Sequence, residues 1–180
     1  SFIPDERLLA LDLSESFPEL PEDFDIVFDL AGAISEHSHS ITSAVAQSDL
    51  VIVPIFNEVK SLTSGIGTLR EVSAVKGFKG KLLVVATKLQ KQSGELFKNS
   101  EWKQSRDFKN IKAAVEESGF DIPVLPLRFS KVFDVIFEKE MSIEQIREAE
   151  ALARYTYRDV SAQFDEIYNY IDELSHAKQK

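Results

Sequence analysis

The sequence contains no cysteine and no long apolar run, and each absence excludes a class of protein. Without cysteine the chain has no disulfide, no thiolate metal site and no cysteine nucleophile, which weakly favours a reducing compartment. No run approaches the roughly 18 apolar residues of a membrane-spanning helix, and no signal peptide is recognisable. We therefore expect a cytoplasmic protein that has no membrane partner.

Positive charge is also scarce, and it is unevenly distributed. The net charge of −9 argues against an overall electrostatic attraction to nucleic acid. Residues 1–36 carry ten acids and only one basic residue, Arg7, whereas residues 76–112 carry ten lysines or arginines and three acids. The second segment would make one face basic, or its lysines would simply form a solvated face around a loop and a helix.

The remaining composition, 43% hydrophobic and 28% charged in 180 residues, is typical of one globular domain. Strands are expected where apolar runs lack alternation, and helices where apolar residues recur every three or four positions. Predicted strands cover 24–30, 50–55, 82–87 and 123–128, and predicted helices cover 40–47, 58–76, 102–118, 132–138 and 142–174. Ser142 and Gln145 would form a capping box at the start of the last helix. Gly119 is placed to end the predicted helix over 102–118. This alternation predicts an α/β fold with a mainly parallel sheet and helices on both faces.

The predicted strand over 24–30 ends in a carboxylate that a glycine soon follows. The carboxyl ends of parallel strands border the ligand crevice of such sheets, so Asp29 and Gly32 would lie at that crevice. An acid there can hold hydrated Mg²⁺, and a glycine admits a phosphate close to the backbone. Alternatively, Asp29 merely caps the turn that follows the strand.

Two histidines invite a metal-site interpretation, which the spacing disfavours. His37 and His39 are two residues apart, so they would not share a helix face, and no third ligand clusters near them. A polar loop is the favoured interpretation of this segment.

The order of several segments resembles the ParA/MinD group of deviant Walker ATPases, and most closely its plasmid-partition ParA proteins. The resemblance covers most of residues 24–174 and is strongest over 24–72. The segments that carry it are Asp25-Ile26-Val27-Phe28-Asp29-Leu30-Ala31-Gly32, Thr42-Ser43-Ala44, Ser48-Asp49-Leu50-Val51-Ile52-Val53-Pro54 and Leu62–Val72. It implies a P-loop NTPase-like fold of the SIMIBI type, in a single ParA-like domain over 1–180 or the C-terminal part of one.

The resemblance also implies roles for individual residues. Asp29 resembles the Walker B acid that holds Mg²⁺ through water, and Gly32 the switch glycine near the γ-phosphate. Thr87 and Lys88 match a pair near the adenine. The segment Pro126–Phe129, which includes Arg128, matches the loop that flanks the base. Taken alone, each of these residues is also compatible with an ordinary structural role.

One part of the family pattern is missing from these 180 residues. The K-G-G-x-G-K-[ST] loop, which would supply cradling amides, a phosphate lysine and a hydroxyl for the metal, has no counterpart. The segment Gly77–Lys81 does not replace it, because it precedes a strand instead of following one. The chain is therefore expected to be part of a longer ATPase whose N-terminal βαβ unit lies upstream, or a relative that has lost hydrolysis. It would be an ATP hydrolase only in the first case.

The leading hypothesis is a ParA-like partition ATPase, or a fragment of one, acting in plasmid or chromosome segregation. The resemblance implies that such a protein binds ATP and Mg²⁺, forms a homodimer, responds to a centromere-binding partner and binds DNA without sequence preference. Candidate DNA-binding residues are Lys76, Lys79, Lys81, Arg147, Arg154 and Arg158. One alternative is a P-loop-less, non-enzymatic interaction protein that pairs with a partner ATPase or with itself. A MinD-like membrane-cycling ATPase ranks last, because the segment Asn169–Leu174 is too acidic for an anionic membrane.

Overall fold

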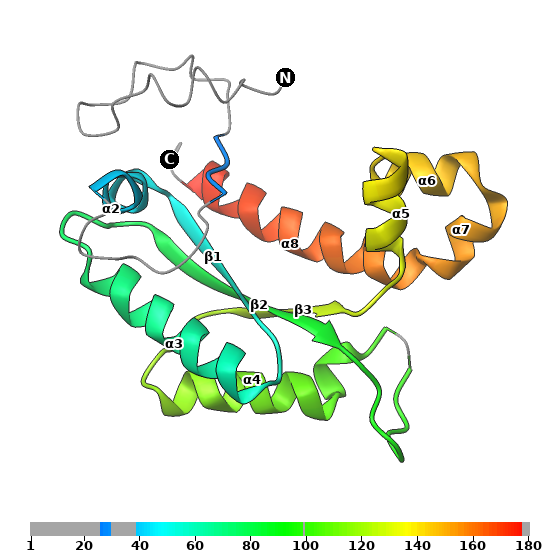
Figure 1. Ribbon diagram of the computed structural model, residues 1–180, viewed down its shortest axis with the longest axis horizontal. Helices are drawn as coiled ribbons and strands as arrows, with labels where there is room; N and C mark the ends of the chain where they lie inside the picture. The colour runs from blue at the N-terminus through cyan, green and yellow to red at the C-terminus, as the bar shows by residue number, and fades with distance from the viewer. Residues whose placement is uncertain (1–25, 30–38, 99, 178–180) are drawn as a thin grey trace. The chain divides into compact units, whose positions relative to one another are not determined.

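A three-stranded parallel sheet forms the centre of the computed structural model, which describes residues 26–29, 39–98 and 100–177. Its strands are β1 (Leu50–Ile55), β2 (Lys81–Leu89) and β3 (Val124–Arg128), in the spatial order β1-β2-β3 (Figure 1). The predicted α/β class with a parallel sheet is confirmed. The three predicted strands over 50–55, 82–87 and 123–128 are also confirmed, with small shifts at their ends.

Helices connect and follow the strands in the order that the sequence predicts. The helical elements are α2 (His39–Gln47), α3 (Val59–Ala74), the 3-10 turn η1 (Trp102–Gln104), α4 (Arg106–Glu117), α5 (Val132–Lys139), α6 (Ile143–Ala149), α7 (Ala151–Thr156) and α8 (Arg158–Ala177).

The chain divides into two compact units. One unit contains the described residues up to Val51 together with Gly67–Lys81, and the other contains Ile52–Ile66 and the described residues from Leu82 onward. The boundary therefore passes through β1 and α3, which contribute residues to both units. The larger unit contains most of the sheet and every element that follows it.

Strand β2 is buried on both faces within the larger unit. Its four consecutive residues Leu83–Ala86 are all buried, which requires cover above and below the sheet. Helix α4 lies on one side of β2 and β3, and α8 lies on the other side, packed against β3 (Figure 1). The predicted helices on both faces of the sheet are thus present.

Helix α3 approaches β1 closely at a glycine. A Cβ built on Gly65 would lie 2.5 Å from Cγ1 of Ile55, a side chain with no exposed surface. Any larger residue at position 65 would have to displace this buried isoleucine. The glycine thus permits the contact between helix and strand, although it weakens the helix itself.

Strand β2 contains one extra residue near its carboxyl end. Ala86 pairs with Pro126, but the next pair joins Leu89 to Arg128, so β2 uses three steps where β3 uses two. Lys88 absorbs the irregularity in a left-handed conformation, with φ of 54°. This is a β-bulge, which bends the strand end and changes the direction of its side chains.

The predicted strand over 24–30 is wrong for the residues that the structure describes. Residues 26–29 form no strand, and Ile26 and Val27 are 44% and 90% exposed. An apolar run becomes a buried strand only where neighbouring strands and helices cover it, and the described sheet pairs only β1, β2 and β3. The remainder of this predicted strand lies outside the described residues.

The predicted single helix over 142–174 is also wrong, because it is divided into α6, α7 and α8. The chain leaves the helical conformation at Glu150, with φ of −125° and ψ of 115°, and again at Tyr157. Residues 142–174 contain no proline or glycine that would signal either break. Packing decides instead: the bends bring Ile146, Ala153 and Val160 into one buried cluster with Val132 of α5.

Local signals at helix ends are confirmed. The hydroxyl of Ser142 accepts from the N–H of Gln145 (3.2 Å), and Oε1 of Gln145 accepts from the N–H of Ser142 (2.8 Å), which completes the capping box. Gly119 adopts φ of 89° just after α4. At the start of α4 the prediction needs adjustment, because Trp102–Gln104 forms a 3-10 turn and Ser105 is the N-cap.

Candidate functional site at the carboxyl ends of β2 and β3

The last residues of β2 and β3 lie side by side at one edge of the sheet. Leu89 pairs with Arg128, and its carbonyl accepts a hydrogen bond of 2.9 Å from the N–H of Phe129. The two segments that the resemblance assigns to the nucleotide base, Thr87-Lys88 and Pro126–Phe129, are therefore adjacent. Carboxyl ends of parallel strands are the usual place for a ligand site in such sheets.

On β2, the side chains of Thr87 and Lys88 are both directed toward the end of β1. The hydroxyl of Thr87 is 3.4 Å from the carbonyl of Ile55, to which it donates. The ammonium of Lys88 lies 4.2 Å from the centre of the Phe56 ring. Lys88 is nevertheless exposed, so its charge remains available to a ligand.

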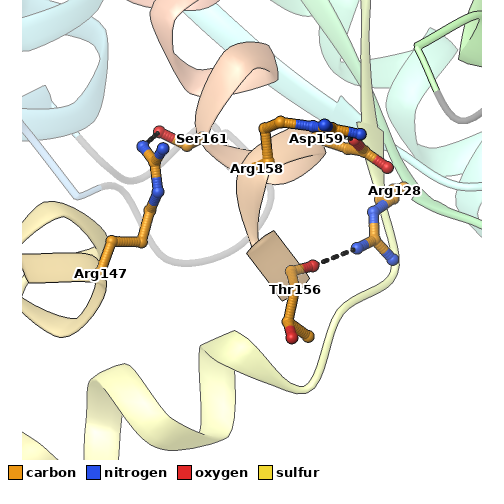
Figure 2. A network of polar contacts seen from close by, with 6 residues as sticks. All are labelled: Arg128, Arg147, Thr156, Arg158, Asp159 and Ser161. Atoms are coloured by element: carbon orange, nitrogen blue, oxygen red, sulfur yellow. Dashed lines mark hydrogen bonds and ion pairs between the residues drawn. The ribbon is translucent and has the colours of Figure 1, made fainter. Parts of the chain in front are cut away.

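On β3, Arg128 is held by several contacts, whereas Pro126 is buried in the sheet opposite Ala86. The backbone N–H of Arg128 donates to Oε1 of Gln163 on α8 (3.0 Å). Its guanidinium donates to the carbonyls of Phe129 (3.2 Å) and Thr156 (3.4 Å), the second of which is drawn in Figure 2. Arg128 thereby links the end of β3 to the junction of α7 and α8.

A pocket of about 300 Å³ lies next to Arg128. The side chains that line it come from the loop after β2, from η1, from β3 and from the junction of α7 and α8. They are Lys91, Trp102, Arg128, Tyr155, Thr156, Arg158 and Asp159. Three of these seven residues are cationic and one is acidic, so the pocket has an excess of positive charge in a chain whose net charge is −9.

A second polar cluster is centred on the buried carboxylate of Asp107, in the first turn of α4. Its Oδ1 accepts from the side-chain amide of Asn57 (2.8 Å), which follows β1, and from that of Gln92 (3.3 Å). Its Oδ2 accepts from the backbone N–H of Gln90 (3.3 Å), just after β2. The carboxylate therefore connects the ends of β1 and β2 to α4, and these bonds provide a donor for each of its two oxygens.

The loop between β2 and α4 contains an acid with a shifted pKa. The N–H of Gln92 donates to Oε2 of Glu95, and this bond is the largest cause that lowers the pKa of the Glu95 carboxyl below its ordinary 4.5. The N–H of Arg106, at the start of α4, donates to Oε1 (2.6 Å) and acts in the same direction. Glu95 thus anchors the loop that carries Lys91 to the N-terminus of α4.

No described contact joins this edge of the sheet to the residues predicted to hold magnesium and the γ-phosphate. Asp29 is exposed and lies in a segment without regular structure, and Gly32 and His37 lie outside the described residues. His39 is the first residue of α2. Among the described residues, no group of three or more histidines, aspartates or glutamates could hold a metal ion.

The predicted DNA-binding residues fall into two groups with different surroundings. Lys76, Lys79 and Lys81 are exposed, and the structure gives them no ion pair with a described residue. The arginines instead contact the helices around them. Arg147 donates to the hydroxyl of Ser161, as Figure 2 shows, and Arg154 donates to the carbonyls of Arg147 (3.0 Å) and Glu148 (3.4 Å).

Arg158, the third arginine, is also exposed. Its side chain is 62% exposed, its Nε lies 3.6 Å from the carboxylate of Asp159, and its guanidinium lies 5.3 Å from the ring centre of Tyr155. It borders the pocket beside Arg128, and Figure 2 shows the two guanidinium groups on neighbouring segments.

Sequence reasoning did not single out Trp102, Asp107 or Gln163. A signal existed for Asp107, since an acid that follows a serine N-cap is typical of a helix start. Trp102 and Gln163 carry no such signal, because only the folded chain brings them to Arg128.

Comparisons with protein-family models, with curated proteins and with solved structures gave no match for this chain. None of the helices in the described part of the chain combines the length and the apolar composition that crossing a bilayer requires.

Proposed function

We propose that the chain is a ParA-like partition ATPase, or part of one, that binds ATP and Mg²⁺, forms a homodimer and acts in DNA segregation with a centromere-binding partner. The observation that supports this most is the adjacency of Thr87-Lys88 and Pro126–Phe129 at the carboxyl edge of the sheet. These segments are 39 residues apart from Thr87 to Pro126, yet they end next to each other, as a base-binding site requires.

In this proposal the residues of the sheet edge bind and orient the nucleotide base. The hydroxyl of Thr87 and the exposed ammonium of Lys88 would contact the base or ribose, and the turn after Pro126 would flank it. Mg²⁺ would neutralise the charge on the phosphates, and Asp29 would hold it through water. The 180 residues contain no K-G-G-x-G-K-[ST] loop, so the phosphate cradle of this family would come from residues outside this sequence.

The test uses the protein produced from its native gene. Its intact mass is measured first, and ATP·Mg²⁺ binding is then measured by calorimetry. We expect saturable binding that Thr87→Val and Lys88→Ala each weaken by about tenfold, the effect of losing one hydrogen bond. The matched control is Lys112→Ala, which removes an exposed lysine from α4 and should leave the affinity unchanged.

Absence of ATP binding by a protein of 20.3 kDa would overturn the ATPase proposal. The second candidate, a non-enzymatic interaction protein, would then be favoured. Its support is a group of exposed large apolar side chains on the helices after β3, namely Phe137 (86%), Leu152 (77%) and Tyr155 (74%). Such residues commonly contribute to protein interfaces. Sedimentation of the protein without nucleotide would test it, and a strictly monomeric chain that also fails to bind a partner ATPase would contradict it.

A further inference from the structure

Buried hydrogen-bond donors without acceptors are concentrated around Arg128. In the part of the chain that the structure describes, four buried side-chain nitrogens have no partner: Trp102 Nε1, Arg128 Nε, Arg147 Nε and Gln163 Nε2. Three of them belong to one connected group, since the guanidinium of Arg128 lies 5.9 Å from the Trp102 ring centre and its backbone donates to Gln163. Trp102 and Gln163 are 7% and 6% exposed. Buried donors in native proteins normally bond to protein, ordered water or a ligand, so this cluster offers several donors to an oxygen that enters the pocket.

The pocket next to this cluster has the charge that attracts an anion. Lys91, Arg128 and Arg158 reach it from three different segments, and among the described residues Asp159 is the only acid that lines it. Arg158 is only partly neutralised, because its nearest contact with Asp159 is 3.6 Å and its side chain is largely exposed. The ammonium of Lys91 donates to the carbonyl of Phe97 (2.6 Å). Because an ammonium has three donors, others remain for a ligand.

We propose that this pocket is a binding site for a small phosphate-type oxyanion, either free or as the phosphoryl group of a small ligand. The cations approach from the loop after β2, from the end of β3 and from the start of α8, so donors are available on several sides. A tetrahedral phosphate presents oxygens in all of these directions, whereas a carboxylate presents two in one plane. Arginine and lysine together are a common phosphate-binding pair.

The site includes its own optical probe, because Trp102 is the only tryptophan in the chain. The fluorescence of the protein is titrated with inorganic phosphate, pyrophosphate and citrate at constant ionic strength. We expect a saturable change with phosphate or pyrophosphate and a weaker one, or none, with citrate. No saturable change with either phosphate compound, or tighter binding of citrate than of both, would overturn the proposal.

Two charge variants at the rim of the pocket should change the affinity for pyrophosphate in opposite directions. Arg158→Gln should weaken binding of pyrophosphate by at least about fivefold, because it removes a charge-assisted donor. Asp159→Asn should tighten it by at least about twofold, because it removes an acid that lines the pocket. The matched controls are Lys112→Gln on α4 and Asp172→Asn farther along α8, both exposed and neither lining the pocket. Equal dissociation constants for wild type, Arg158→Gln and Asp159→Asn would also overturn the proposal.

This inference does not depend on the proposed ATPase function. Thr87 and Lys88, which test that function, do not line the pocket, so Thr87→Val and Lys88→Ala should leave the pyrophosphate affinity unchanged. Failure to bind ATP·Mg²⁺ with phosphate binding intact would overturn the first proposal alone. Loss of the phosphate response with intact ATP·Mg²⁺ binding would overturn only the second.

Discussion

The lysines at and just before the start of β2 and the arginines of α6 and α7 carry the same charge in different surroundings. Lys76, Lys79 and Lys81 extend into solvent without a described ion pair, whereas Arg147 and Arg154 donate to a hydroxyl and to backbone carbonyls. A guanidinium that is held by such contacts has fewer free donors and less freedom to reach a phosphate than an exposed lysine. We therefore expect that DNA binding, if the proposed function holds, would use the lysines, and that these two arginines mainly stabilise the helices around them. The sequence alone offered no reason to separate the two groups.

The largest effect expected from the contrast between held arginines and exposed lysines is a loss of stability at Arg147. Arg147→Ala removes the hydrogen bond to the buried hydroxyl of Ser161 and should lower the free energy of unfolding by about 2 kcal/mol, as for other bonds to charged groups. Urea unfolding followed by circular dichroism measures it. Lys76→Ala is the control and should change stability by less than about 0.5 kcal/mol. Equal losses in the two variants would remove the distinction.

The lysines are tested next, by DNA binding. Replacing Lys76, Lys79 and Lys81 together with alanine should weaken binding to random-sequence duplex about tenfold or more, and should lower the salt slope by up to about 3, because each phosphate contact contributes about 0.9. Fluorescence anisotropy at several salt concentrations measures both quantities. An unchanged slope in the triple variant would place the DNA contact elsewhere, and so would a similar loss in Arg154→Ala.

A smaller effect is expected at Arg154. Its guanidinium satisfies two carbonyls near the end of α6, where the helix breaks at Glu150. Arg154→Ala should cost about 1 kcal/mol of stability, because the carbonyls are partly reachable by water. Arg154→Lys retains the charge but not the fork of donors, so it should recover less than half of the loss in urea unfolding. Full recovery by lysine would mean that charge alone matters there.

The smallest effect concerns Glu95, a partly exposed acid whose side chain, unlike those of the lysines, accepts hydrogen bonds from the backbone. The lowered pKa of Glu95 means that the folded state favours the carboxylate, so its contribution is present above pH 4.5 and is lost as the pH falls through the folded-state pKa. The stability difference between wild type and Glu95→Gln should therefore shrink on acidification. Urea midpoints of both proteins at pH 6 and at about pH 3.5 measure it. A constant difference would contradict the assignment.

The sequence predicts well those features that depend on neighbouring residues. The three strands of the sheet, the Ser142–Gln145 capping box and the glycine after α4 all follow from local patterns. Prediction from the sequence fails where contacts between residues far apart in the chain determine the structure. The break at Glu150 depends on the core shared with α5, and residues 26–29 form no strand although their composition favours one.

The candidate site follows the same rule. Strand ends could be located from apolar runs, but Thr87, Lys88 and Arg128 were named as site residues only because of the resemblance to a known family. The partners of Arg128 could not be, since Gln163 and Thr156 lie 35 and 28 residues away and have no distinctive neighbours. Likewise, the carboxylate of Asp107 meets Asn57 across 50 residues. The roles of Asp29 and Gly32 stay predictions, because no described contact involves them.

The bulge in β2 makes the number of residues in this strand matter separately from their identity. Side chains of a strand alternate between its two faces, so the additional residue at Lys88 sets the phase of everything that follows it. With this residue, Leu89 is fully buried and its carbonyl reaches the N–H of Phe129. Without it, the side chain of Leu89 would point to the opposite face of the sheet, and so would the strand residue that enters the next loop. Position 88 thus acts as a spacer for the carboxyl edge of the sheet, whatever its ammonium group contacts.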